Sequence, residues 1–160
     1  MPDANGSVRR RAADRLRGVD THRRIAVRSE RKIHRIDVTS EVSNAIASLG
    51  VRSGWVLVSV PHTTAALTVG ENWDPDVGGD LERALAKWVP DVPFHHSEGN
   101  SAAHFLSEVI GTSRFLVVEE GRPRFGRWQG VFLLELDGPR AREIWVDVRP
   151  PGPEDPEKSP

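Results

Sequence analysis

Short apolar segments with strand composition alternate with segments of helical periodicity, and this order constrains the fold more than any other feature. Residues 55–60 are rich in β-branched and aromatic residues and are closed by Pro61, so they predict a fully buried strand. Further strands are predicted at residues 24–29, 33–38, 66–69, 115–118, 128–136 and 144–148. Turn residues, Gly121-Arg122-Pro123 and Asp137-Gly138-Pro139, separate the last three strands, which we therefore expect to be linked as consecutive hairpins.

Three segments have the spacing of amphipathic helices. The first begins at Thr39 or Ser40 and ends at Gly50. The second begins at Asp74-Pro75, where an aspartate cap precedes a proline in the first helical position, and the third begins near Asn100. Strands followed by interleaved helices and further strands predict an α+β fold, a single compact domain with helices packed on a mixed or antiparallel sheet.

Two adjacent glycines, Gly78 and Gly79, interrupt the second helical segment. Each costs a helix about 1 kcal/mol relative to alanine. Either the helix begins after them or another group approaches its backbone closely, and we expect the late start.

Composition limits the classes of function. The 160 residues are enough for one domain, and 22 basic against 23 acidic residues give no overall field for nucleic acid or acidic membranes. The absence of cysteine excludes disulfides and thiolate chemistry, so a metal would need histidine and carboxylate ligands. No apolar run is long enough to span a membrane or to form a signal peptide, and we expect a soluble cytoplasmic protein without membrane partners.

Both ends of the chain have the composition of tails, which leaves residues 21–149 as the folded domain. Residues 1–20 are rich in arginine and poor in large apolar residues, which predicts disorder. Such an arm could touch RNA or anionic lipid, but a solvated tail explains it as well. The proline-rich residues 150–160 are also expected to be disordered.

His62 and Glu71 are the first candidate functional residues. His62 follows the buried strand, where it could bind a metal, carry a proton or simply hydrogen-bond a loop. Glu71, with Asn72, comes just beyond the next strand, and its carboxylate could orient a histidine or transfer a proton. The alternative for Glu71 is a surface carboxylate paired with an arginine.

Several short motifs occur in a characteristic order and together resemble the YjbQ-like family, whose members are described as secondary thiamine-phosphate synthases. The motifs are His62-Thr63-Thr64-Ala65-Ala66-Leu67, Glu71-Asn72, Asp74-Pro75-Asp76-Val77, Phe94-x-His96, Asn100-x-x-x-His104, Gly111, Gly121, Gly126-x-Trp128-Gln129 and Asp137-Gly138-Pro139-Arg140-x-Arg142. The resemblance covers roughly residues 25–148. It implies a compact α+β subunit, a homotrimer and a pocket near subunit boundaries that is lined by histidines.

The resemblance also implies a set of site residues. His62, His96 and His104 would be ligands of a divalent metal, zinc or magnesium, although His95 competes with His96 for this place. His62, Glu71 and His104 would be catalytic. The residues expected to bind substrate are Thr63, Asn72, Asn100, Trp128, Gln129 and Arg142. Trp128 could stack on a planar ligand or be a core residue.

Two kinds of site fit these residues. One is an open metal site, and the other is an anion site made by histidines, arginines and the helix end near Asn100. The implied reaction couples a hydroxymethylpyrimidine pyrophosphate to a thiazole phosphate with loss of pyrophosphate, as either the main or a side activity. The alternatives are a non-catalytic trimeric protein that binds a small phosphorylated metabolite and, from the arginine arm alone, a nucleic-acid-binding protein.

Overall fold

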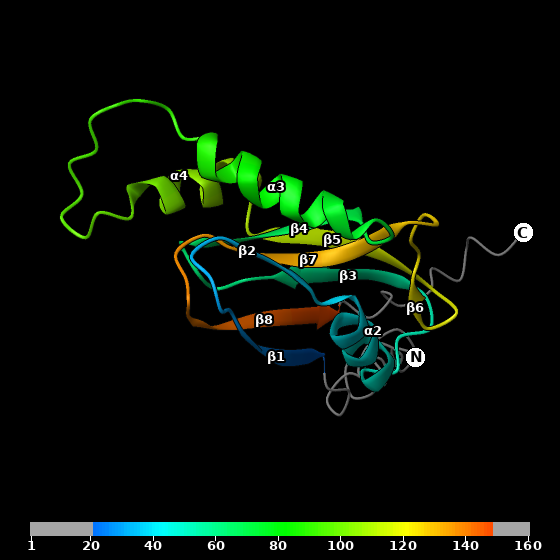
Figure 1. Cartoon of the computed structure of the whole chain (residues 1–160). Helices are drawn as coiled ribbons and strands as arrows, with labels where there is room; N and C mark the ends of the chain where they lie inside the picture. Colours follow the sequence, from blue (N-terminus) through cyan, green and yellow to red (C-terminus); the bar gives the residue numbers. More distant parts are fainter. Residues whose placement is uncertain (1–20, 149–160) are drawn as a thin grey trace, which may run out of the picture.

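Two antiparallel sheets and three helices make up residues 21–148, the part of the chain that the computed structural model describes (Figure 1). The five-stranded sheet has the order β1 (His22–Arg28), β8 (Ala141–Val148), β3 (Gly54–Ser59), β5 (Ser113–Glu119) and β6 (Arg122–Pro123). The three-stranded sheet has the order β2 (His34–Asp37), β7 (Gln129–Glu135) and β4 (Ala65–Glu71). The helices are α2 (Thr39–Ser48), α3 (Pro75–Lys87) and α4 (Ser101–Ile110).

This architecture confirms the predicted α+β domain, and each predicted strand and helix is present near its expected position. The predicted hairpin order is wrong. β7 pairs with β2 and β4, whereas β8 pairs with β1 and β3, so the chain changes sheets between them. Turn residues specify a local reversal of the chain but not the strand with which the next strand pairs. The sequence pattern therefore did not distinguish a hairpin from a change of sheet.

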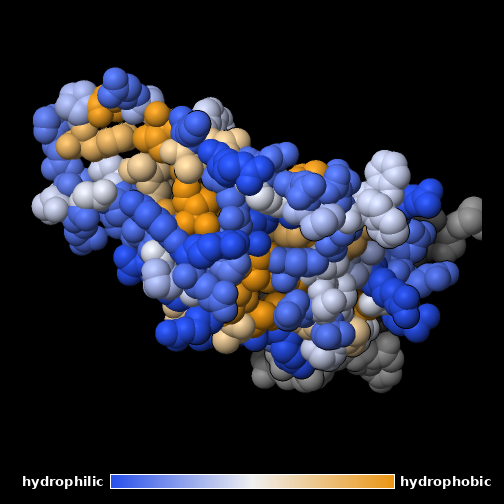
Figure 2. Space-filling model, in the orientation of Figure 1, coloured by the Kyte–Doolittle hydropathy of each residue, from blue (hydrophilic) through white to orange (hydrophobic). Residues whose placement is uncertain are grey.

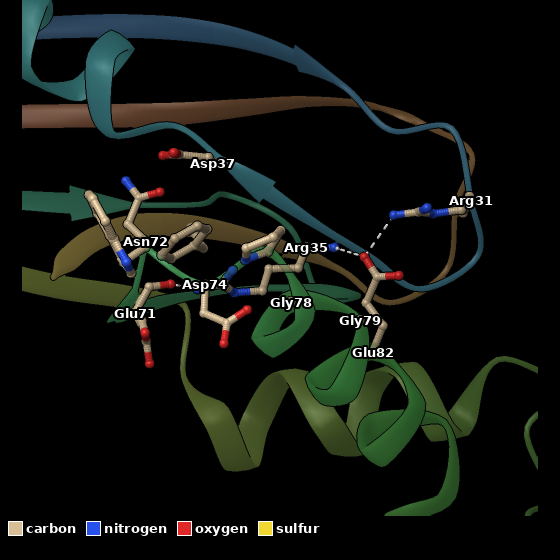
Figure 3. A pocket seen from close by; sticks show the side chains of 12 residues that line it. Arg31, Arg35, Asp37, Glu71, Asn72, Asp74, Gly78, Gly79 and Glu82 are labelled. Carbon is tan, nitrogen blue, oxygen red and sulfur yellow. Dashed lines mark hydrogen bonds and ion pairs between the residues drawn. The ribbon is translucent and has the colours of Figure 1, made fainter.

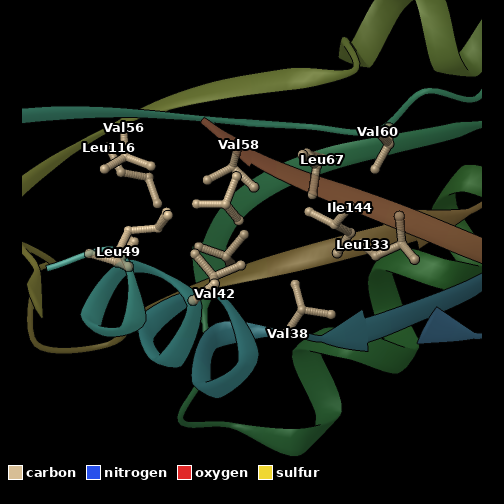
Figure 4. Close-up of a cluster of buried hydrophobic side chains, with 14 of the residues drawn as sticks. Val38, Val42, Leu49, Val56, Val58, Val60, Leu67, Leu116, Leu133 and Ile144 are labelled. Atoms are coloured by element: carbon tan, nitrogen blue, oxygen red, sulfur yellow. The ribbon is translucent and has the colours of Figure 1, made fainter. Parts of the chain in front are cut away.

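The main core lies between the two sheets and is closed by α2 (Figure 4). Val56, Val58 and Ile144 of the larger sheet face Leu67 and Leu133 of the smaller sheet, and all five are buried. β7 is buried on both faces, since Leu134 belongs to a second cluster with side chains of α3 and α4. Successive strand residues point to opposite faces, so β7 forms the middle layer of the domain.

The expectation that α3 starts late is wrong. The helix begins at Pro75, and the side chain of Asp74 accepts a hydrogen bond from the Asp76 N–H. Gly78 lies inside the helix, and a Cβ there would be 3.3 Å from Nη1 of Arg35. The second reading of the two glycines is therefore correct: a guanidinium group packs against the helix backbone.

The predictions for residues 1–20 and 150–160 fall outside the described residues. Within residues 21–148, no helix is long and apolar enough to cross a membrane.

Gly138 gives a direct test of how closely the segment before β8 is packed. A Cβ at this position would lie 2.3 Å from the Arg31 carbonyl oxygen and 2.7 Å from both Glu135 Cγ and Ser29 Oγ. We expect Gly138→Ala to lower the free energy of unfolding by about 1–3 kcal/mol, measured by urea denaturation, because all three clashing groups belong to the backbone or to buried side chains.

Gly70→Ala is the matched control, since the nearest atom to its added Cβ is Arg35 Nη2 at an ordinary 3.6 Å. It should change the free energy of unfolding by less than about 0.5 kcal/mol. Equal destabilisation by the two substitutions would contradict this packing.

Candidate functional site

His62 is held in place by β8, an inner strand of the larger sheet. It lies in the connection between β3 and β4, and its Nε2 accepts a hydrogen bond of 2.8 Å from the backbone N–H of Glu143 in β8. Burial lowers the pKa of His62 below 6.5, and the nearby Arg142 guanidinium lowers it further, against smaller opposite effects of Glu135 and Glu143. The ring is therefore neutral at pH 7, with its proton on Nδ1.

Beneath His62 lies a buried ion pair between β7 and β8. Arg142 donates from Nε to Glu135 Oε2 at 2.7 Å and from Nη2 to Oε1 at 2.5 Å. Nη2 also donates to the side-chain oxygen of Thr64 at 2.8 Å. Only 6% of the Arg142 side chain and none of the Glu135 side chain is exposed. Two-point contact with a planar guanidinium fixes the orientation of both groups.

Glu135 is ionised despite its burial. Burial alone raises the pKa of this carboxyl, but hydrogen bonds from Arg142, from the Asp137 N–H and from Ser29 outweigh it. The pKa of Glu135 consequently lies below its ordinary value of 4.5. The charge of Arg142 is thus balanced inside the protein rather than by solvent.

The N-terminal end of α4 is open. Asn100 precedes the helix, but its side chain does not cap it. Instead, Asn100 Nδ2 donates to Asp137 Oδ2 at 3.0 Å, and Arg140 Nη2 donates to the same oxygen at 2.6 Å. Burial raises the pKa of Asp137, but these two hydrogen bonds lower it more, so the carboxylate is ionised and can only accept.

This contact determines which way the Asn100 amide points. Its nitrogen faces Asp137, and its oxygen is buried without a hydrogen-bond partner among residues 21–148. In the same part of the chain, the N–H groups of Ser101 and Ala102 also make no hydrogen bond. These first N–H groups of a helix favour negative charge.

A cavity of about 300 Å³ connects these groups, and we call it the histidine cavity. It is lined by Pro61, His62, Thr63, Thr64, Glu98, Asn100, His104, Asp137, Arg140 and Arg142. His96 does not line it but lies against His104, with ring centroids 5.4 Å apart in an edge-to-face arrangement. The cavity combines two guanidinium groups, two imidazoles and an open helix end, a set suited to an anion.

The structure brings together about half of the predicted site residues. His62, Thr63, Asn100, His104 and Arg142 all line the histidine cavity. Apart from His96, the other predicted residues lie at the opposite end of β4, a strand of seven residues that spans about 20 Å. One chain therefore does not form the single pocket expected from the motifs.

Glu71 and Asn72 line a second cavity, of about 510 Å³, which we call the Arg35 cavity (Figure 3). The carboxylate of Glu71 makes no direct ion pair within residues 21–148, although its charge raises the pKa of Arg35. Trp128 and Gln129 lie nearby, since the Asn72 N–H donates to the Trp128 carbonyl and Gln129 pairs with Glu71. Trp128 is 55% exposed and is not a core residue.

The predicted metal site does not fit the arrangement of the histidines. His62 uses Nε2 for the Glu143 N–H, and its Nδ1 carries the proton. Among residues 21–148, no three histidine or carboxylate side chains are placed to hold one metal ion. We therefore derive no chemical step through a metal.

Sequence reasoning missed Glu135 and Glu143. Glu143 contributes a backbone N–H, which no sequence pattern reveals. Glu135 did carry a signal, because a lone acidic residue follows the apolar run 131–134 and precedes Leu136. A charge at a buried strand position requires a partner.

Comparison with known proteins identifies relatives for almost the whole described region. The sequence model of the family described as UPF0047 protein YjbQ-like matches residues 23–150. The chain is 38% identical over 123 residues to a UPF0047 protein of Methanocaldococcus jannaschii, covering 76% of this chain and 89% of the relative. It is also 38% identical over 127 residues to UPF0047 protein YugU of Bacillus subtilis, covering 78% and 96%.

Solved structures agree with this relationship. A crystal structure of a YjbQ/UPF0047 protein from Clostridium acetobutylicum matches with a TM-score of 0.75 and 38% identity, covering 79% of this chain and 99% of that one. A protein from Sulfolobus solfataricus, described as YbjQ-like and of unknown function, matches with a TM-score of 0.73 and 30% identity, covering 79% and 94%. These likenesses support the fold and leave the activity open.

The buried ion pair predicts a specific pH dependence of stability. A carboxyl whose pKa is lowered by folding stabilises the fold fully above its ordinary pKa, and this contribution is lost as the pH falls through the folded-state pKa. We expect Glu135→Gln to cost about 3–5 kcal/mol at pH 7, because it leaves Arg142 buried without a counter-charge. Below pH 4.5 the difference from wild type should shrink.

Urea denaturation of both proteins between pH 7 and pH 3 measures this difference. Glu108→Gln is the control, since Glu108 is exposed on α4. A cost of Glu135→Gln that stays constant over this range, or matches that of Glu108→Gln, would contradict the assigned ion pair.

Proposed function

The chain belongs to the UPF0047 YjbQ-like family, and on this premise we propose that it binds a small phosphorylated metabolite in the histidine cavity. The proposal rests on one observation: two arginines and two histidines line a single cavity at the open end of α4. They are Arg140, Arg142, His62 and His104. Both guanidinium groups are already paired with carboxylates, Arg140 with Asp137 and Arg142 with Glu135. A ligand would therefore be bound by the hydrogen-bond donors of these groups and by the helix end rather than by net positive charge.

We further propose that the protein is an enzyme of the thiamine-phosphate synthase type. The reaction joins a hydroxymethylpyrimidine pyrophosphate to a thiazole phosphate and releases pyrophosphate. Stabilising the charge of the departing pyrophosphate is the main demand of such a reaction, and preoriented cations and helix N–H groups meet it. Arg140 and the N–H groups of Ser101 and Ala102 would bind the phosphates, while neutral His62 offers its Nδ1 proton as a donor.

Each part of this catalytic group has a supporting contact. The Glu143 N–H fixes the ring of His62, and the Glu135 carboxylate fixes Arg142. His104 stands on the first turn of α4, where its backbone N–H bonds to the Asn100 carbonyl. Glu71 would reach this ligand only from a neighbouring subunit, because its own cavity is at the other end of β4.

We also propose a homotrimer. Several large apolar side chains of the single chain are strongly exposed, which supports this proposal. They include Trp55, Trp88, Val92, Phe94 and Phe115. Figure 2 shows hydrophobic residues among polar ones on one face of the molecule. Light scattering should give three times the chain mass of 17.7 kDa, and a monomer at micromolar concentration would refute the trimer.

A turnover assay tests the enzymatic proposal. Purified protein with both substrates and Mg²⁺ should form thiamine phosphate, and His62→Ala or His104→Ala should each lower the rate by about 10²-fold. Arg124→Gln, an exposed arginine outside the cavity, should leave the rate unchanged. No product above background, with His62→Ala indistinguishable from wild type, would overturn the activity.

The alternative is a binding protein without turnover. It predicts saturable binding of phosphate compounds without product, with binding retained in Glu71→Gln. The same purified protein distinguishes the two, since binding that depends on His62 without turnover would favour the alternative.

A further inference from the structure

The Arg35 cavity contains a guanidinium group with one buried donor that has no partner among residues 21–148. The Arg35 guanidinium lies over the ring of Phe132, with its Cζ 3.2 Å from the ring centroid. Its Nη2 donates to the Glu71 carbonyl oxygen at 2.5 Å, but its Nε is buried without a partner among residues 21–148. Burial also lowers the pKa of Arg35, with Asp37, Glu82 and Glu71 acting oppositely. Buried polar groups of this kind are rare in native proteins and need an explanation.

Three of the four carboxylates around this cavity already have structural partners. Asp37 accepts hydrogen bonds from the backbone N–H and the hydroxyl of Thr39. Asp74 caps α3. Glu82 accepts from Arg31 Nη2 and from the backbone N–H of Arg35, both at 2.8 Å. None of the three pairs with the Arg35 guanidinium.

Two side chains that line the cavity with Arg35 have no hydrogen-bond or ion-pair partner in the described region. The side chains of Glu71 and Asn72 make no hydrogen bond or ion pair within the described region, and both line the cavity. Glu71 is partly buried, so its carboxylate is not simply a solvated surface charge. The cavity thus offers a guanidinium and a carboxylate that make no direct ion pair with each other, although the charge of Glu71 raises the pKa of Arg35 (Figure 3).

Gly78 forms another part of the wall around the Arg35 guanidinium. Gly78 places the α3 backbone within reach of the guanidinium, because a Cβ there would already be 3.3 Å from Nη1. A side chain at this position would push Arg35 away from the helix. Gly78, although unfavourable for the helix, therefore leaves room for the guanidinium in the cavity.

We propose that the Arg35 cavity is a second binding site, for a small zwitterion such as an amino acid. The anionic group of the ligand would pair with the Arg35 guanidinium, its ammonium group would pair with Glu71, and the Asn72 amide would hydrogen-bond either group. Such a ligand would pair with the Arg35 guanidinium and the Glu71 carboxylate at the same time. A simple anion or cation could pair with only one of them. Within one chain this site shares no lining residue with the histidine cavity, so its ligand can be tested without assuming what that cavity binds.

Nuclear magnetic resonance titration of the full chain tests this site. Glycine, β-alanine and γ-aminobutyrate serve as probes because they span a range of charge separations. Acetate and methylammonium carry one charge each. At least one zwitterion should shift the Arg35 Nε–H and the Gly78 amide signals, with a Kd at least tenfold below those of acetate and methylammonium.

Two variants and a control complete the test. Glu71→Gln removes a charge without breaking a bond in the described region, so it should fold normally and raise the Kd at least tenfold. Arg35→Gln should do the same, whereas Arg124→Gln should not. Equal binding of all five probes, unchanged affinity in Glu71→Gln, or signal shifts confined to the histidine cavity would overturn the proposal.

Discussion

The buried ion pair between Glu135 and Arg142 is the interaction on which both the fold and the site depend. Glu135 ends β7 of the smaller sheet, and Arg142 lies in β8 of the larger sheet, so the pair joins the two layers. Ser29, just after β1, donates to the same carboxylate, and Thr64, just before β4, accepts from the same guanidinium. Four chain segments thus meet at one buried pair of charges. Removing either charge leaves the other desolvated, which makes the pair costly to break.

The same pair determines the geometry of the histidine cavity. Arg142 lies beneath His62 and lowers its pKa, while the next residue, Glu143, holds the ring by a backbone N–H. Glu135 also accepts from the Asp137 N–H, and Asp137 in turn orients Asn100 at the end of α4. The cations and the helix end are therefore positioned by contacts already needed for folding. A site built in this way is preorganised, because its groups do not have to move to meet a charged ligand.

Much of the fold could be predicted from local patterns, whereas the pairing of strands could not. The apolar spacing located β3, α2 and α4 correctly, since this signal acts within a few residues, although neither helix is capped by a side chain. The sheet order depends on which apolar faces meet in the core, and the turns carry no such information. Likewise, the motifs correctly grouped His62 with Asn100, but they did not reveal that β4 separates His62 from Glu71. The role of Gly78 could not be predicted either, because it depends on the approach of Arg35, which is distant in the sequence.

The central claim is that the histidine cavity binds an anion through groups held by the buried ion pair. Calorimetric titration with pyrophosphate tests this most directly, since it needs no turnover and no second substrate. We predict saturable binding to the wild-type protein that weakens at least tenfold in Arg140→Gln and stays unchanged in Arg124→Gln. No binding to the wild type, or equal binding to both variants, would contradict the account.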